Sequence, residues 1–230
     1  MIILDDNNDF KVKTVLTSMI VVDIETSGLD FTKCGIWQIG ALYIDNPKNT
    51  FLEEARIDDN DLIEPEALRV GGKTESDLRD GKKQSQKQLL INFFSWVKKT
   101  NNFAMLSHNP QDLDYTLVVK KAKQYSLEFP FHHRCFDMHS MAQLKFFQVN
   151  GNFLMKPGMG VSEMGLSHVL EFCGMEDNRI KAGQKGVNEG HPHNALEDCR
   201  LTAECFSRIV FGKSLIEDYS KFLIPSYLKK

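Results

Sequence analysis

Two carboxylates stand two residues apart in an otherwise apolar stretch near the start of the chain. The stretch, residues 20–30, reads IVVDIETSGLD, and the acids are Asp23 and Glu25. Side chains alternate across a strand, so the two acids share one face. Two partly buried carboxylates this close repel each other unless a cation lies between them, and Mg²⁺ or Mn²⁺ prefers such oxygen ligands. The pair therefore suggests a metal site, although a single D-x-E is more often part of a salt-bridged surface strand.

A third acid, Asp114, follows a short apolar run at residues 103–107 and the dipeptide His108-Asn109. The run predicts a buried strand, and a helix is expected from about Asp112 to Tyr125. A carboxylate at this strand-to-helix corner faces the open end of the sheet, where α/β folds place ligands. Alternatively, Asp114 only favours the positive end of the helix dipole.

A fourth acid lies in the stretch GHPHNALED, residues 190–198. Asn194 is a good N-cap for a helix over 195–210, with Glu197 as its expected capping-box partner. Asp198 then lies one turn inside the helix, and His193 precedes the cap on a glycine-flanked approach. The alternatives are that Asp198 is only a favourable N-terminal charge and that the histidine is an ordinary loop residue.

The elements that must position these residues follow from the apolar patterns. Strands are expected over 19–25, 36–44, 50–57, 103–107 and 134–137, with a turn at Asp45-Asn46-Pro47. Helices are expected over 64–68, 85–99, 112–125, 166–173 and 195–210, and a further helix follows the strand over 134–137 and ends near residue 147. Loops are expected over 150–165 and 176–192. Strands first, followed by alternating helices and strands, predict one α/β domain with a mixed sheet.

Composition narrows the class of protein. The 230 residues carry a net charge of −3, which argues against a broad basic surface that coats duplex nucleic acid. No apolar run of about 18 residues suggests a membrane span, and the start does not resemble a secretory signal. The five cysteines form no C-x-x-C pair, which favours an intracellular, cytoplasmic protein. A zinc site is improbable, because its candidate ligands fit no common tetrahedral spacing: His191, His193, Cys199 and Cys205.

Together the three acidic motifs resemble the DEDD superfamily of 3′–5′ exonucleases, in its histidine-containing (DEDDh) branch. The likeness rests on Asp23-Ile-Glu25 followed by Thr-Ser-Gly-Leu29, and on Asp114 and Asp198, each five residues after Asn109 and His193. Within this branch, the chain is similar to the exonucleases that resemble the proofreading subunits of polymerase III. The resemblance covers about residues 18–212. Residues 1–17 are then an N-terminal extension and 213–230 a C-terminal tail.

The resemblance implies a ribonuclease H-like fold, an α/β fold with a mixed five-stranded sheet flanked by helices, and two-metal hydrolysis. Two Mg²⁺ ions about 3.5–4 Å apart are expected, with Mn²⁺ able to substitute. Asp23 would bridge both ions, Glu25 and Asp198 would hold the ion on the nucleophile side, and Asp114 would act on the other. His193 would accept the proton of the attacking water.

By the same resemblance, Thr26 and Leu29 line a pocket for the terminal nucleotide, and His108 and Asn109 contact the 3′ end. The expected substrates are single-stranded or frayed 3′ ends of DNA or RNA, the products are nucleoside 5′-monophosphates, and DNA repair or proofreading is the expected setting. A polymerase partner or a homodimer is left open, and no membrane partner is expected.

Two alternatives accompany this interpretation. Asp112-Leu113 in the second motif resembles oligoribonuclease more than the proofreading subunits, so an enzyme acting on short RNA is one. The other is a non-catalytic module that binds nucleic-acid ends or a partner protein. The complete set of acids argues against such loss of activity, because buried like charges without metal are destabilising.

Overall fold

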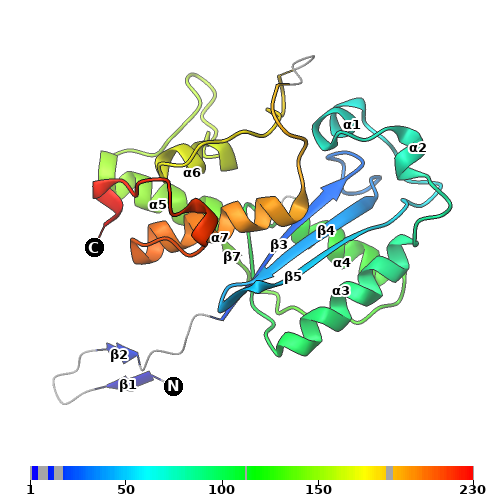
Figure 1. The fold of residues 1–230 in the computed structure, drawn as a ribbon, viewed down its shortest axis with the longest axis horizontal. Coiled ribbons are helices and arrows are strands. Elements are labelled where there is room, and N and C mark those ends of the chain that lie inside the picture. Colours follow the sequence, from blue (N-terminus) through cyan, green and yellow to red (C-terminus); the bar gives the residue numbers. More distant parts are fainter. Residues whose placement is uncertain (1, 5–9, 13–17, 112, 185–188, 230) are drawn as a thin grey trace.

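A mixed five-stranded sheet with helices on both faces forms the centre of the molecule (Figure 1). The structure is a computed structural model that describes residues 2–4, 10–12, 18–111, 113–184 and 189–229. The strand order is β5-β4-β3-β6-β7, in which β3, β4 and β5 run antiparallel and β6 and β7 run parallel to β3. The expected α/β fold with a mixed sheet is confirmed.

The first three strands of this sheet form a meander: β3 (Ile20–Thr26), β4 (Ile36–Tyr43) and β5 (Asn46–Glu54). The expected turn at residues 45–47 was placed too late, because β5 already begins at Asn46 and includes Pro47. A proline is tolerated there because β5 lies at the edge of the sheet and one side of the strand needs no hydrogen-bonding partner. The remaining strands are short: β6 (Met105–Ser107) and β7 (Phe136–Asp137).

Two layers of helices cover the sheet. One face carries α3 (Gln86–Thr100) and α4 (Asp114–Gln124), and the other carries α5 (Met138–Asn150), α6 (Leu166–Phe172) and α7 (Ala195–Phe211). Two short helices follow β5 in sequence and lie near the tip of β3: α1 (Pro65–Gly71) and α2 (Glu75–Leu78) (Figure 1). The sequence analysis missed α2, whose single turn is too short to show an apolar period. The expected helix start at Asp112 lies outside the described residues.

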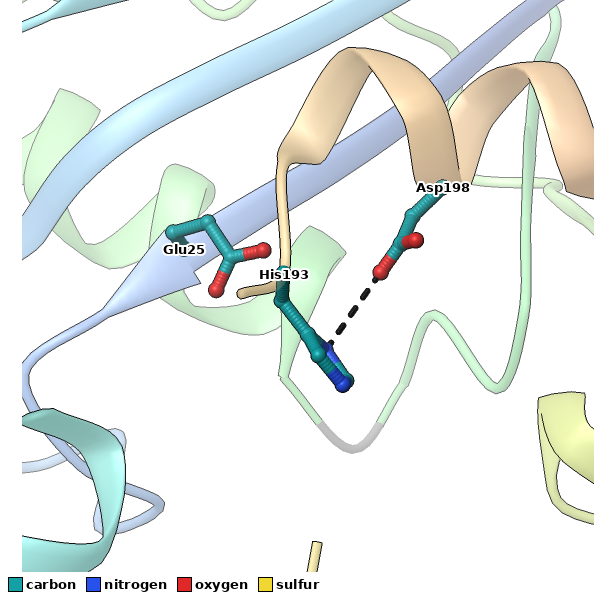
Figure 2. A group of neighbouring side chains, drawn as sticks. All are labelled: Glu25, His193 and Asp198. Atoms are coloured by element: carbon teal, nitrogen blue, oxygen red, sulfur yellow. Dashed lines mark ion pairs between the residues drawn. The ribbon is translucent and has the colours of Figure 1, made fainter. Parts of the chain in front are cut away.

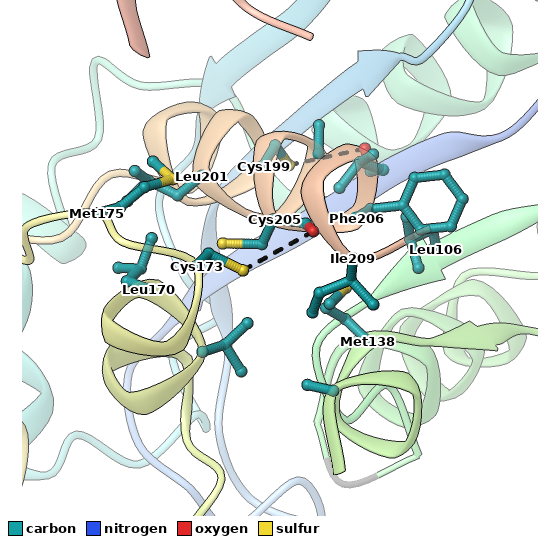
Figure 3. Packing of buried hydrophobic residues seen from close by; sticks show 14 of the residues in the cluster. Leu106, Met138, Leu170, Cys173, Met175, Cys199, Leu201, Cys205, Phe206 and Ile209 are labelled. Carbon is teal, nitrogen blue, oxygen red and sulfur yellow. Dashed lines mark hydrogen bonds between the residues drawn. The ribbon is translucent and has the colours of Figure 1, made fainter. Parts of the chain in front are cut away.

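Strand alternation divides the core into two clusters. Ile20, Val22 and Ile24 of β3 pack with α3 and α4, while Val21 packs on the opposite face with α5, α6 and α7. Figure 3 shows the second cluster, in which Cys205 and Ile209 of α7 lie next to Cys173 at the end of α6 and Met138 of α5. Asp23 and Glu25 have the same parity as Val21, so they lie on the α7 face at the end of β3.

The segments at both ends of the chain have local structure of their own. β1 (Ile2–Leu4) and β2 (Phe10–Val12) pair with each other in a separate two-stranded sheet. After α7, two short 3-10 helices, Glu217–Tyr219 and Ser226–Leu228, bury Tyr219 and Leu228 in the α7 cluster. The fully buried Arg208 of α7 holds this segment by donating to the carbonyl of Tyr219 at 2.9 Å. The expected domain boundaries at residues 17 and 212 stay predictions.

No helix in the described ranges combines the length and the apolar character that crossing a bilayer requires.

Helix α7 begins in direct contact with the sheet. A Cβ atom at Gly40 of β4 would lie 2.2 Å from the carbonyl carbon of Ala195 and 2.3 Å from the nitrogen of Leu196. The side chain of Gln38 accepts a hydrogen bond from the Ala195 amide at 2.8 Å. Only glycine allows this approach, and the approach determines how far Asp198 reaches over β3.

Gly40→Ala should therefore displace the first turn of α7. We expect the substitution to lower the free energy of unfolding by about 1–3 kcal/mol or more, as overpacking does, measured by urea denaturation. Gly81→Ala is the matched control, because no atom lies within 4 Å of a Cβ at that position. Equal unfolding free energies for the two variants would contradict the proposed role of Gly40.

Candidate active site

Three of the predicted site residues come together at the end of β3. Ligand atoms of Glu25, His193 and Asp198 lie within 4.8 Å of one another (Figure 2). Glu25 comes from β3, His193 from the segment before α7, and Asp198 from the first turn of that helix. Asp23, one strand period before Glu25, lies on the same face, and its charge interacts with those of Asp198, Asp114 and Glu25. The four predicted acids and the histidine therefore form one cluster.

Asp114 is held in place by two hydrogen bonds. Its Oδ1 accepts from the Ile24 amide at 3.1 Å, and its Oδ2 accepts from the Ser107 hydroxyl at 2.7 Å. The pairing of β3 with β6 covers only Ile20 with Met105 and Val21 with Leu106. The Ile24 amide lies past this pairing, and it donates to the side chain of Asp114 instead of to a strand. The strand pairing thus brings an acid from α4 beside Asp23.

The carboxylate of Asp198 is buried and lies close to the side chains of Arg179 and His193. Its Oδ2 lies 3.0 Å from Nη1 of Arg179 and 3.5 Å from Nδ1 of His193. Its Oδ1 is buried and has no hydrogen-bond partner among the described residues. One oxygen of this carboxylate is therefore satisfied and the other is available to a ligand.

His193 is oriented by backbone groups on two sides. Its amide donates to the carbonyl of Val70 at 3.0 Å, and its Nε2 lies 2.8 Å from the carbonyl of Ile180. A carbonyl only accepts, so Nε2 carries the proton in this contact. In the neutral ring Nδ1 is then the basic nitrogen, and it is the one that faces Asp198.

Crowding of like charges dominates the electrostatics of the cluster. Burial, and then the charges of Asp114, Asp198 and Glu25, raise the pKa of Asp23 well above its usual range. Burial and the charges of Asp198 and Asp114 do the same for Glu25. Burial raises the pKa of Asp198 as well, although the positive charge of Arg179 opposes the rise. These carboxylates are costly to ionise without an additional cation.

The cluster fits a hard divalent cation. It offers several carboxylate oxygens and one imidazole, it has more negative than positive charge, and Oδ1 of Asp198 is a buried acceptor with no partner among the described residues. Oxygen-rich donor sets of this kind suit Mg²⁺ and Mn²⁺. Cys199, one of the four candidate zinc ligands, is buried in the core with its Sγ 3.3 Å from the carbonyl of Gly40.

The predicted substrate-binding residues lie around this cluster. A cavity of about 550 Å³ is lined by Asp23 and Asp114 together with His108 and Asn109. Burial and the nearby His139 lower the pKa of His108 to about 4, so its ring is neutral near pH 7. Asn109 adopts a left-handed backbone with φ 59°, a conformation that asparagine tolerates.

Thr26 and Leu29 differ in accessibility. Thr26 is buried, and its hydroxyl donates to the carbonyl of Gly28 at 2.6 Å. The side chain of Leu29 is 76% exposed, and its amide donates to Glu64 at 3.3 Å. An apolar side chain this exposed is available for contact with a ligand.

Sequence reasoning missed the residues that hold the cluster together. The most important is Arg179, which lies in the polar segment over residues 176–192 that was expected only to be a loop. An excess of acids implies that some cation is nearby, but the sequence did not show which one. The capping-box expectation was also wrong in part. Asn194 caps α7, but Glu197 accepts instead from the Tyr219 hydroxyl at 2.5 Å, because the folded C-terminal segment competes for its carboxylate.

The fold and the acidic cluster define an α/β nuclease domain of the ribonuclease H-like class. The model of the exonuclease family RNase_T matches residues 20–206, and the chain belongs to this family. It is therefore an exonuclease, and the expected resemblance to exonucleases is confirmed at the level of this family. The family implies dependence on a divalent metal ion. No curated protein matches the sequence.

Solved structures with the same fold have low sequence identity to this chain. The nuclease domain of 3′hExo, a DEDDh family member bound to rAMP, is 16% identical with a TM-score of 0.60, over 94% of this chain and 99% of that one. E. coli Exonuclease I in complex with a dT13 oligonucleotide is 15% identical with a TM-score of 0.60, over 83% of this chain but 41% of that one. Cell-death related nuclease 4 is 13% identical with a TM-score of 0.60, over 86% of this chain and 64% of that one.

The crowded carboxylates predict that Asp23→Asn stabilises the metal-free protein. A carboxyl whose pKa is raised by folding binds its proton more tightly in the folded state, so stability falls as the pH rises from the ordinary carboxyl range through the raised pKa. In EDTA near pH 7 the variant should melt at a higher temperature than the wild type, by about 2–4 °C for each kcal/mol of repulsion removed. At acid pH the difference should disappear.

Asp59→Asn, which changes an exposed acid outside the cluster, is the control for the loss of one charge. The repulsion model would be contradicted if the melting temperature rose in this control, or if it did not rise in Asp23→Asn.

Proposed function

We propose that this protein is a metal-dependent 3′–5′ exonuclease that hydrolyses the terminal phosphodiester bond of nucleic acids and releases nucleoside 5′-monophosphates. The observation that carries the proposal is the convergence of acids from β3, α4 and α7 beside a histidine whose basic nitrogen faces them. The family match supports the same chemistry.

The acids divide between two metal positions in this proposal. Glu25 and Asp198 would hold the ion on the side of the attacking water, Asp114 would serve the other ion, and Asp23 would serve both. When bound, two Mg²⁺ ions, or Mn²⁺ in their place, stabilise negative charge on the attacking and leaving oxygens. Oδ1 of Asp198, without a partner among the described residues, supports a ligand on that side.

His193 would act as the general base. Because Nε2 donates to the carbonyl of Ile180, Nδ1 is free to take the proton of the attacking water. The water oxygen forms a bond to the terminal phosphorus, and the bond from phosphorus to the 3′ oxygen of the preceding nucleotide breaks. The terminal nucleotide leaves with its 5′-phosphate, and the 3′ oxygen of the shortened strand takes a proton from solvent water to become a 3′-hydroxyl.

The 3′ end would enter the 550 Å³ cavity beside Asp23, where His108 and Asn109 are available to the last nucleotide. Thr26 and Leu29 would line the pocket for its base and sugar. A second cavity, of about 820 Å³, shares Ser162 and Gly165 with the first and offers a route for the rest of the strand. A path between protein elements suits a single strand or a frayed end.

The chemical class of nucleic acid is proposed broadly. The 3′hExo neighbour is bound to an RNA nucleotide and the Exonuclease I neighbour to a DNA oligonucleotide, so both substrates belong in the test. The five cysteines are free thiols, which supports a cytoplasmic, reducing location. A polymerase or homodimer partner, and a role in repair or proofreading, stay predictions.

Direction and product are tested with end-labelled oligonucleotides of DNA and RNA, single-stranded and duplex, in Mg²⁺ or Mn²⁺. A 3′ label should appear at once as a nucleoside 5′-monophosphate, whereas a 5′ label should give a descending ladder. Asp23→Ala and Asp198→Ala should abolish release while circular dichroism shows a retained fold. Full activity in the Asp23→Ala variant would rule the site out.

His193→Ala should lower kcat by about 10²–10⁴, the usual contribution of a general base. His191→Ala is the matched control, since His191 precedes the site on the same segment and its ring is exposed. The control should retain activity close to that of the wild type. Equal losses in both variants would point to distortion of the segment and not to loss of the base.

A further inference from the structure

The segment between α6 and α7 inserts one arginine into the acidic cluster. Nε and Nη2 of Arg179 contact the two oxygens of Asp177 at 2.9 and 3.2 Å, and the third nitrogen, Nη1, lies 3.0 Å from Oδ2 of Asp198. The guanidinium is therefore anchored along one edge by Asp177 while its other edge reaches a predicted metal ligand. Its side chain is only 10% exposed.

The positive charge of Arg179 lies directly against the acidic cluster. Its Nη1 is 3.0 Å from Oδ2 of Asp198, and ligand atoms of Asp198 and Glu25 lie within 4.8 Å of each other. This is the charge compensation that a bound metal ion would otherwise supply. Arg179 and a divalent ion thus meet the same electrostatic need at the same carboxylate.

Asp177 is held independently of the contact between Arg179 and Asp198. Lys181 lies 2.9 Å from Oδ2 of Asp177, and the Ser167 hydroxyl donates to the same oxygen at 2.5 Å. Arg179 can therefore give up Asp198 and remain anchored at Asp177. The neighbouring carbonyl of Ile180 can still orient His193.

We propose that Arg179 is an internal counter-cation that occupies Asp198 in the metal-free protein and is displaced from it when a divalent ion binds. The inference rests on the proposed function, because it takes Asp198 as a metal ligand. Arg179 then has two opposite effects: it stabilises the metal-free fold and weakens the apparent affinity for metal. Protein folded without metal would be protected from repulsion among its own acids.

The test measures metal binding directly. Mn²⁺ binding to EDTA-treated protein is measured by titration calorimetry for the wild type, Arg179→Gln, Arg179→Lys and Arg200→Gln, and thermal unfolding is measured with and without Mn²⁺. Arg200 is the matched control because it lies on α7 two residues after Asp198 but pairs with Asp218 and Glu197. Its substitution removes the same charge without touching Asp198.

Arg179→Gln should bind Mn²⁺ about 5–150-fold more tightly than the wild type, the usual range for coupling between two ligands. Its melting temperature should fall in EDTA but approach that of the wild type in saturating Mn²⁺. Arg179→Lys keeps the positive charge but lacks the planar guanidinium that spans Asp177 and Asp198, so its affinity for Mn²⁺ should be intermediate. Because the charge is kept, this variant should fold even if Arg179→Gln does not. Arg200→Gln should bind Mn²⁺ as the wild type does.

Three outcomes would overturn the inference, and the third is distinguishable from the first two. In the first outcome, the wild type binds Mn²⁺ and releases mononucleotides, but Arg179→Gln binds Mn²⁺ no more tightly than Arg200→Gln does. This result would overturn the role of Arg179 and leave the proposed function standing. An equal fall in the melting temperature of Arg179→Gln with and without Mn²⁺ would do the same, since it shows a purely structural arginine. Wild-type protein that neither binds Mn²⁺ nor releases mononucleotides would overturn the proposed function as well.

Discussion

Repulsion among carboxylates gathered at one end of the sheet is the constraint on which the rest of the site depends. Asp23 and Glu25 cannot avoid each other, because strand alternation puts them on one face, and α7 brings Asp198 against them. Burial intensifies the repulsion, since it removes the water that would screen it. The close approach of α7 to the sheet brings these charges together, and Arg179 compensates for part of them.

The elements that gather the acids belong to the core of the fold. Helix α7 packs its apolar side on the sheet through Cys199 and Phe206, and Gly40 lets its first turn approach β4. The hydrophobic contacts therefore stabilise the helix in the one position where Asp198 meets β3. On the other side, Asp114 satisfies the Ile24 amide, so the acid serves the sheet as well as the site.

The segment over residues 177–193 supplies the compensation. Arg179 reaches Asp198, the carbonyl of Ile180 sets which nitrogen of His193 is basic, and the amide of Ile180 donates to the carbonyl of His191 at 2.9 Å, which ties the two halves of the segment together. The described residues of this segment thus hold both the positive charge and the histidine of the cluster. Irregular backbone is suited to this task, because its amides and carbonyls are not committed to a helix or a sheet.

The sequence by itself was sufficient to predict the class of fold and to select the four acids and the histidine that lie together in the structure, because these depend on local spacing. Alternation on β3 and the Asn194 cap of α7 are short-range properties that survive in any packing. Tertiary structure decided the rest: that Glu197 turns to Tyr219 instead of closing a capping box, that β5 starts early because it is an edge strand, and that Arg179 is the cation among the acids. These depend on contacts between segments distant in sequence, and a polar, glycine-dotted segment has no apolar period that would predict where its side chains lie.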